Sequence, residues 1–124
     1  MNNKRKKRIL VIDDEGPIAD MIGDFCEALG FEVKEYEADQ DVLAVVKHFQ
    51  PDLITLDLIM PKMSGLEVME IVKSDPETKD IPILILSSIA GDQSVDEMLR
   101  QCQGILQKPI QLTTLREKLS TLVA

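Results

Sequence analysis

Carboxylate, hydroxyl and ammonium side chains follow four short apolar segments that lie far apart in this sequence. They are Asp13 and Asp14 after the segment 9–12, Asp57 after 53–56, Ser87 after 83–86, and Lys108 shortly after 105–106. If these segments are parallel neighbouring strands, their carboxyl ends meet at one edge of a sheet. Carboxylates that crowd together repel one another unless a cation joins them, and Mg²⁺ prefers oxygen ligands. The pattern therefore predicts a divalent-metal site at that edge.

The lysine and the serine indicate that a phosphoryl group completes this site. A lysine ammonium supplies a point charge, a serine hydroxyl supplies a hydrogen-bond donor, and both suit phosphoryl oxygens. An aspartate can attack phosphorus and form an aspartyl-phosphate. Taken alone, any such residue is more often a solvated loop residue or a helix cap, and Glu15 is assigned to that class. The support comes from their recurrence at the ends of different predicted strands.

Short continuous apolar runs alternate with longer segments of helical apolar spacing. Strands are predicted at the continuous runs 9–12, 53–56, 83–86 and 105–106, and at 31–36, where a weaker, alternating pattern suits an edge strand. Helices are predicted at 18–29, 42–49, from a capping box at 64–67 onward, from about 92 to Cys102, and from 112 to the chain end. This alternation is typical of an α/β fold in which helices cover both faces of a doubly wound, five-stranded parallel sheet.

Composition restricts the classes of function that remain. Five of the 14 Lys and Arg residues fall within residues 2–8, so the rest of the chain is more acidic than its net charge of −8 indicates. Direct nucleic-acid binding by this acidic body is not expected. We interpret 1–8 as a basic solvated tail and 9–124 as one domain. Membrane association is not expected, and the apolar surroundings of Cys26 and Cys102 favour reduced thiols and a cytoplasmic location.

Four segments of the chain resemble the receiver domain of two-component response regulators. They are ILVIDDEGP, PDLITLDLIMPKMSGLEV, IPILILSS and KPI, and the resemblance covers residues 8 to 124. It implies a flavodoxin-like (βα)5 fold with strand order 2-1-3-4-5. It also implies a phosphorelay function, in which a histidine kinase or histidine phosphotransfer protein supplies the phosphoryl group from a phosphohistidine.

The same resemblance assigns roles to single residues. It implies that Asp57 accepts the phosphoryl group and also binds Mg²⁺. Asp14 would bind the metal directly, Asp13 largely through water, and Ile59 through its main-chain carbonyl. We therefore expect Mg²⁺ as the cofactor of this chain.

Lys108, Ser87 and Ile105 form the rest of the implied switch. Lys108 would pair with the phosphoryl group, and the Ser87 hydroxyl would turn toward it. Ile105 stands where the family usually has Tyr or Phe, so the usual coupling of hydroxyl and aromatic ring is altered here. The expected result is a change in a partner-binding surface, read by a downstream protein or an output domain, or by formation of a phosphorylation-dependent dimer.

Three other functions were weighed against a phosphoacceptor. An aspartate phosphatase of the haloacid-dehalogenase type would need a second Asp two positions after Asp57, where this chain has Ile59. A nucleotide or flavin site would need donors in place of the acids 13–15. A receiver-like interaction module that works without phosphorylation is favoured by Ile105 and opposed by the intact acids, and it stays open. No turnover enzyme is expected.

Overall fold

The computed structural model describes residues 6–37, 40–58, 60, 64–87 and 102–123, and the strands among them form one parallel sheet. The strands are β1 (Arg8–Ile12), β2 (Glu32–Glu35), β3 (Leu53–Asp57), β4 (Ile83–Ser87) and β5 (Gly104–Gln107). Their spatial order is β2-β1-β3-β4-β5, and every neighbouring pair is parallel. The predicted flavodoxin-like fold and its strand order are confirmed.

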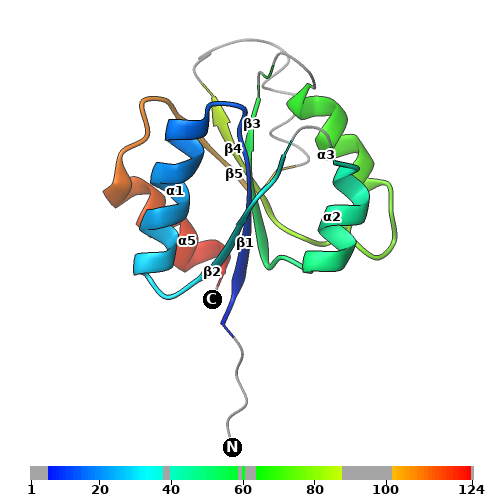
Figure 1. The fold of residues 1–124 in the computed structure, drawn as a ribbon, viewed down its shortest axis with the longest axis horizontal. Coiled ribbons are helices and arrows are strands. Elements are labelled where there is room, and N and C mark those ends of the chain that lie inside the picture. The colour runs from blue at the N-terminus through cyan, green and yellow to red at the C-terminus, as the bar shows by residue number, and fades with distance from the viewer. Residues whose placement is uncertain (1–5, 38–39, 59, 61–63, 88–101, 124) are drawn as a thin grey trace, which may run out of the picture.

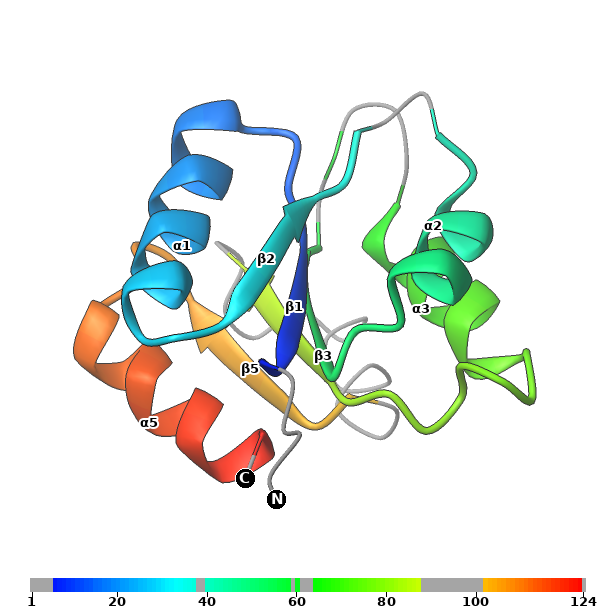
Figure 2. The same ribbon diagram turned by 60° about the horizontal axis from the view of Figure 1, so that its bottom comes forward.

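Helices cover both faces of this sheet (Figure 1). The described helices are α1 (Gly16–Ala28), α2 (Val42–Phe49), α3 (Gly65–Lys73) and α5 (Leu112–Leu122). α1 and α5 lie on one side of the sheet, and α2 and α3 lie on the other; the turned view in Figure 2 shows the same two layers. This is the doubly wound arrangement that the alternation of apolar patterns predicts.

Local sequence signals begin and end the helices. A proline stands in the first turn of α1, and Gly30 follows that helix with a φ of 99°, a left-handed conformation that glycine adopts without strain. Asp41 accepts a hydrogen bond from the Ala44 amide at the start of α2. The Ser64 hydroxyl accepts one from the Leu66 amide at the start of α3, as the capping sequence predicts.

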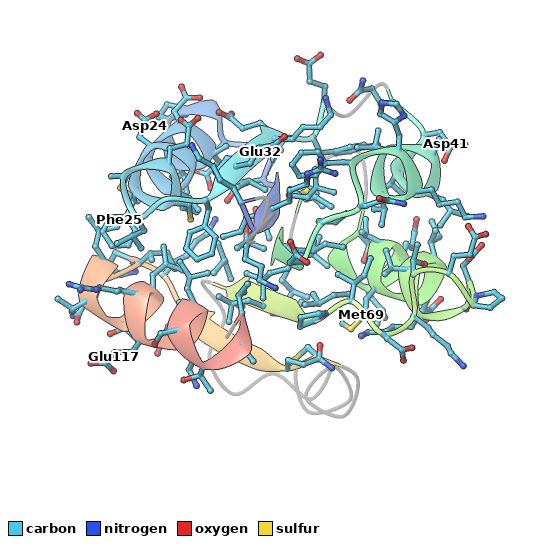
Figure 3. All side chains as sticks on the ribbon, turned by 90° about the horizontal axis from the view of Figure 1, so that it is seen from below. Asp24, Phe25, Glu32, Asp41, Met69 and Glu117 are labelled. Atoms are coloured by element: carbon cyan, nitrogen blue, oxygen red, sulfur yellow. The ribbon has the colours of Figure 1, made fainter. Side chains whose placement is uncertain are left out.

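The core consists of two apolar layers separated by the sheet. Successive strand residues point to opposite faces, so Ile9 and Val11 pack toward α1 and α5, whereas Leu10 and Ile12 pack toward α2 and α3. In Figure 3, Met69 lies between α3 and the sheet. Because β1, β3 and β4 are buried on both faces, their sequences are continuously apolar.

Most strands and helices differ from their predicted bounds by one or two residues, and Cys102 lies outside the helix predicted for it. β1 begins at Arg8, one residue earlier than expected. Cys102 lies in the bend at 102–103 that precedes β5, so it does not end a helix. Its side chain is half-buried, whereas Cys26 in α1 is fully buried. Residues 92–101 of the predicted fourth helix lie outside the described residues. In the part of the chain that is described, no helix is both long and apolar enough for a membrane span.

Candidate functional site

Three aspartates meet at the carboxyl end of the sheet. β1 and β3 are adjacent, with Ile12 opposite Leu56, so the residues after β1 come next to Asp57, the last residue of β3. Carboxylate oxygens of Asp13, Asp14 and Asp57 all lie within 4.8 Å of one another. Sequence spacing predicted this convergence, and strand register produces it.

The three carboxylates differ in burial. Asp13 and Asp57 are buried, and Asp14 is exposed to solvent. Asp13 is also fixed by a local hydrogen bond, because its Oδ1 accepts from the Glu15 amide at 2.9 Å. The site thus has two buried acids on its inner side and one acid on its solvent side.

Lys108 supplies the positive charge of the site, and it follows β5, an edge strand of the sheet. The Lys108 amide donates to the Ser87 carbonyl at 2.7 Å, which extends the pairing of β4 and β5 past its last register pair. Its Nζ lies 3.3 Å from Asp13 Oδ2 and 3.3 Å from Asp57 Oδ1. The Lys108 side chain is only 12% exposed, so little water screens these contacts.

Negative charge exceeds positive charge at this site. Burial, and next the charge of Asp13, raise the pKa of Asp57 to about 6, against the opposing pull of Lys108. Burial lowers the pKa of Lys108, but Asp13 and Asp57 raise it more, so the net shift is upward. One ammonium therefore does not compensate three carboxylates. The donor set consists of hard oxygens around an uncompensated negative charge, which suits a divalent cation such as Mg²⁺.

Ser87 and Ile105 are placed on neighbouring strands. Ser87 is the last residue of β4 and is buried, and by strand alternation it shares a face with Ile85. Ile105 of β5 is half-buried and packs against the cluster on the α2 and α3 side, opposite Ile85. Both side chains of the predicted switch thus lie on one face of the sheet. Ile59, the predicted main-chain ligand, lies outside the described residues.

Two features of the site were not recognised in the sequence. Glu15, interpreted there as an ordinary loop residue, has its Oε1 3.5 Å from Lys108 Nζ. The start of α3 presses against the end of β3: the Gly65 amide donates to the Leu58 carbonyl, and a Cβ on Gly65 would lie 2.6 Å from the Asp57 carbonyl oxygen. The run of three acids was the available signal for Glu15, and no local pattern reveals the crowding at Gly65.

Comparison with known proteins places this geometry in a defined class. The family model of the response regulator receiver domain matches residues 9–120. The chain is 26% identical to the chemotaxis protein CheY4 of Vibrio cholerae, with a TM-score of 0.86 over 95% of this chain and 99% of that one. It is 27% identical to the receiver domain of a DNA-binding response regulator from Colwellia psychrerythraea 34H, with a TM-score of 0.87 over 95% and 98%.

Curated relatives agree with this class. The phosphate regulon transcriptional regulatory protein PhoB of Pseudomonas aeruginosa is 44% identical over 82 residues, and the DNA-binding dual master transcriptional regulator RpaA of Synechocystis is 38% identical over 119. The matches cover 66% and 82% of this chain but only 36% and 49% of those proteins. The polar-differentiation response regulator DivK of Brucella ovis is 32% identical over 108 residues, 84% of this chain and 85% of that protein.

The fold and the acidic end of the sheet define a signalling domain of the receiver type. This chain belongs to the response regulator receiver domain family of two-component signalling.

Proposed function

We propose that this chain is a phosphoacceptor that takes a phosphoryl group from a phosphohistidine of a partner kinase or phosphotransfer protein onto Asp57. The observation that carries the proposal is the position of the buried Asp57 carboxylate, which is 3.3 Å from Lys108 Nζ and within 4.8 Å of the carboxylates of Asp13 and Asp14. The proposed nucleophile, the Lys108 ammonium and the proposed metal-binding acids are thereby held together at one end of the sheet.

The transfer is a single displacement at phosphorus. An Asp57 carboxylate oxygen forms a bond to phosphorus as the bond between phosphorus and the donor imidazole nitrogen breaks, and the electron pair of that bond stays on the imidazole. Lys108 is placed to neutralise charge on the transferred oxygens. Asp13, Asp14, Asp57 and the Ile59 main-chain carbonyl would hold Mg²⁺. When bound, Mg²⁺ supplies further charge neutralisation for the phosphoryl group.

Phosphorylation would then act through Ser87 and the surface beyond it. Phosphorylation replaces the charge of the Asp57 carboxylate with a phosphoryl group that carries up to about two negative charges, so the end of β3 gains about one negative charge. The Ser87 hydroxyl, at the end of the adjacent strand, is placed to turn toward that charge. Ile105 has no aromatic ring to rotate, so we propose that the conformational change proceeds by repacking of an aliphatic side chain against the α2 and α3 side of the sheet.

The output is proposed to be protein binding in the cytoplasm. The receiver surface would contact a downstream protein, an output domain or a second copy of itself. PhoB and RpaA, two relatives named as transcriptional regulators, are longer than the matched region, so DNA binding is not assigned to this domain. We propose a signalling acceptor and not a turnover enzyme, because Ile59 stands where an aspartate phosphatase would need its acid/base residue.

Intact-mass spectrometry tests the proposal. The chain is incubated with Mg²⁺ and acetyl phosphate, beside an Asp57→Asn variant and a metal-free sample. We expect one hydroxylamine-labile phosphoryl group on the parent chain and none in either control. If a folded, Mg²⁺-binding chain takes no phosphoryl group from acetyl phosphate or from phosphorylated histidine donors, the result favours the interaction module that works without phosphorylation.

A further inference from the structure

Glu15 contacts Lys108 from outside the group of three aspartates. Its Oε1 lies 3.5 Å from Lys108 Nζ, which is also 3.3 Å from Asp13 and 3.3 Å from Asp57. Among the described residues, Glu15 alone pairs with Lys108 without belonging to the metal-binding set. The Glu15 side chain is 57% exposed, so its carboxylate approaches the ammonium from the solvent side of the site.

The backbone around Glu15 fixes this approach. The Glu15 amide donates to Asp13 Oδ1 at 2.9 Å, and the Glu15 carbonyl accepts from the Ala19 amide at 2.9 Å as the first turn of α1 forms. Glu15 occupies the N-cap position in an extended conformation, yet its side chain makes no capping hydrogen bond. An acid at a helix N-terminus ordinarily interacts with the helix dipole. Here the carboxylate is instead in contact with a lysine from the far edge of the sheet.

The three partners of Lys108 respond differently to a divalent cation. An ammonium has three N–H donors, and in this structure three carboxylates face it. A cation held by the aspartates, directly or through bound water, would neutralise the charge of Asp13 and Asp57 and repel the Lys108 ammonium. Glu15 is outside that set, so its attraction for Lys108 would remain.

We propose that Glu15 is a positioning residue that retains Lys108 at the carboxyl end of the sheet while Asp13 and Asp57 hold a divalent cation. The inference rests on the proposed function, because it takes the three aspartates to be the metal site. Glu15 then releases the ammonium to the phosphoryl group, whose oxygens carry more charge than one carboxylate. Glu15 thus prepares the chain for transfer without touching the reacting atoms.

The exchange of Lys108 ammonium protons with water tests this role directly. The full chain is labelled with ¹⁵N-lysine, and the Lys108 signal is identified by its loss in Lys108→Arg. Without metal, Glu15→Gln is expected to leave the exchange rate nearly unchanged, because Asp13 and Asp57 still hold the ammonium. In saturating Mg²⁺, we expect Glu15→Gln to increase the exchange rate of the Lys108 ammonium protons about three- to fivefold. This corresponds to the upper range of free energies contributed by a partly exposed ion pair.

A matched variant controls for the loss of one negative charge. Asp24→Asn makes the same charge change on α1, at an exposed position on the outer side of the molecule in Figure 3, and is expected to leave the exchange rate unchanged. If both chains bind Mg²⁺ and Lys108 exchanges at the same rate in Glu15→Gln and in the parent chain, the role of Glu15 is overturned. The proposed function is not affected by that result. In a second sample labelled uniformly with ¹⁵N, Asp13 and Asp14 amide signals that do not respond to Mg²⁺ would overturn the metal site, and this inference with it.

Discussion

At Asp57, the buried position of the proposed phosphoacceptor carboxylate is costly to the fold. The side chain is buried beside a second carboxylate, and its pKa rises to about 6 because of burial first and Asp13 second. Among the described residues, Lys108 is the cation that offsets that cost in the absence of metal. The charge of this buried carboxylate is not fully compensated by the fold, and this favours binding of a cation. The same excess of negative charge therefore affects both stability and the proposed function.

The raised pKa of Asp57 predicts how stability depends on pH. The unfolded carboxyl ionises near 3.8, so between about pH 4 and 6 the folded chain binds the extra proton and the free energy of unfolding falls as pH rises. Without metal, Asp57→Asn should therefore be up to about 3 kcal/mol more stable than the parent chain at neutral pH, with no advantage below about pH 4.

Urea unfolding in a metal chelator, repeated across this pH range, measures that difference. Glu117→Gln is the control, since Glu117 is exposed on the outer side of α5 (Figure 3) and its replacement should give no pH-dependent difference. Equal stability of Asp57→Asn and the parent chain at neutral pH would show that the buried charge carries no cost.

The buried hydroxyls of Thr55 and Thr78 have opposite effects on the stability of the fold. Thr55 Oγ1, in the centre of β3, has no hydrogen-bond partner within the described part of the chain, whereas Thr78 Oγ1 donates to the Val72 carbonyl at 2.7 Å. We expect Thr55→Val to raise the free energy of unfolding by about 1 kcal/mol and Thr78→Val to lower it by about 1 to 2 kcal/mol. Urea midpoints of the two variants measure this, and a loss of stability in Thr55→Val would refute the unpaired assignment.

At the level of secondary structure, the junction of β3 and α3 holds Asp57, the proposed acceptor, in place. A Cβ on Gly65 would lie 2.6 Å from the Asp57 carbonyl oxygen and 2.8 Å from the Cα of Leu58, distances that force the backbone to move. The Gly65 amide also donates to the Leu58 carbonyl. Close approach of α3 to the end of β3 therefore requires glycine, and this junction positions Asp57, the proposed phosphoryl acceptor.

Gly65→Ala should consequently impair both stability and phosphorylation. We expect a loss of about 1 to 3 kcal/mol from overpacking, together with slower phosphoryl transfer because Asp57 is displaced. Gly16→Ala is the control: nothing lies within 4 Å of its added Cβ, and it should be neutral or slightly stabilising. Unfolding curves and phosphorylation time courses of both variants decide the matter, and a Gly65→Ala chain that matches the parent in both would contradict this account.

The elements themselves were largely predictable, because both signals that define them are local or periodic. Four continuous apolar runs and one alternating run identified the five strands, and the ends of β1 and β3 brought Asp13 together with Asp57. The interaction of Glu15 with Lys108 was missed because those residues are 93 positions apart and the direction of a loop side chain has no sequence signature. The sequence pattern predicted Cys102 at the end of a helix, because the apolar spacing just before a strand is similar to the apolar spacing at the end of a helix.

Across the whole molecule, the two ends of the sheet hold different groups of contacts. At the amino end, the Arg8 amide donates to Asp52 Oδ2 and its Nη1 donates to the Phe49 carbonyl, both at 2.8 Å, and the guanidinium lies 5.6 Å from the centre of the Phe49 ring. These contacts join β1 to the end of α2. The acidic group and Lys108 occupy the opposite end, so contacts at the amino end can be removed without changing the chemistry.

Arg8→Ala tests this separation. Loss of the guanidinium contacts should cost about 1 kcal/mol, while the rate of phosphorylation by acetyl phosphate should stay within about twofold of the parent rate, because additivity holds for distant sites. Lys7→Ala is the control, because the Lys7 side chain is exposed. A strong decrease of phosphorylation in folded Arg8→Ala would show that the two ends are coupled.

Identification of the phosphorylated residue tests the central claim most directly. The chain is phosphorylated in Mg²⁺, treated with borohydride, which reduces an aspartyl-phosphate to homoserine, and analysed by peptide mass spectrometry. We predict conversion of Asp57 alone, with Asp13 and Asp14 unchanged. Conversion at another aspartate, or phosphate carried on His48 with Asp57 intact, would contradict the assignment of Asp57 as the acceptor.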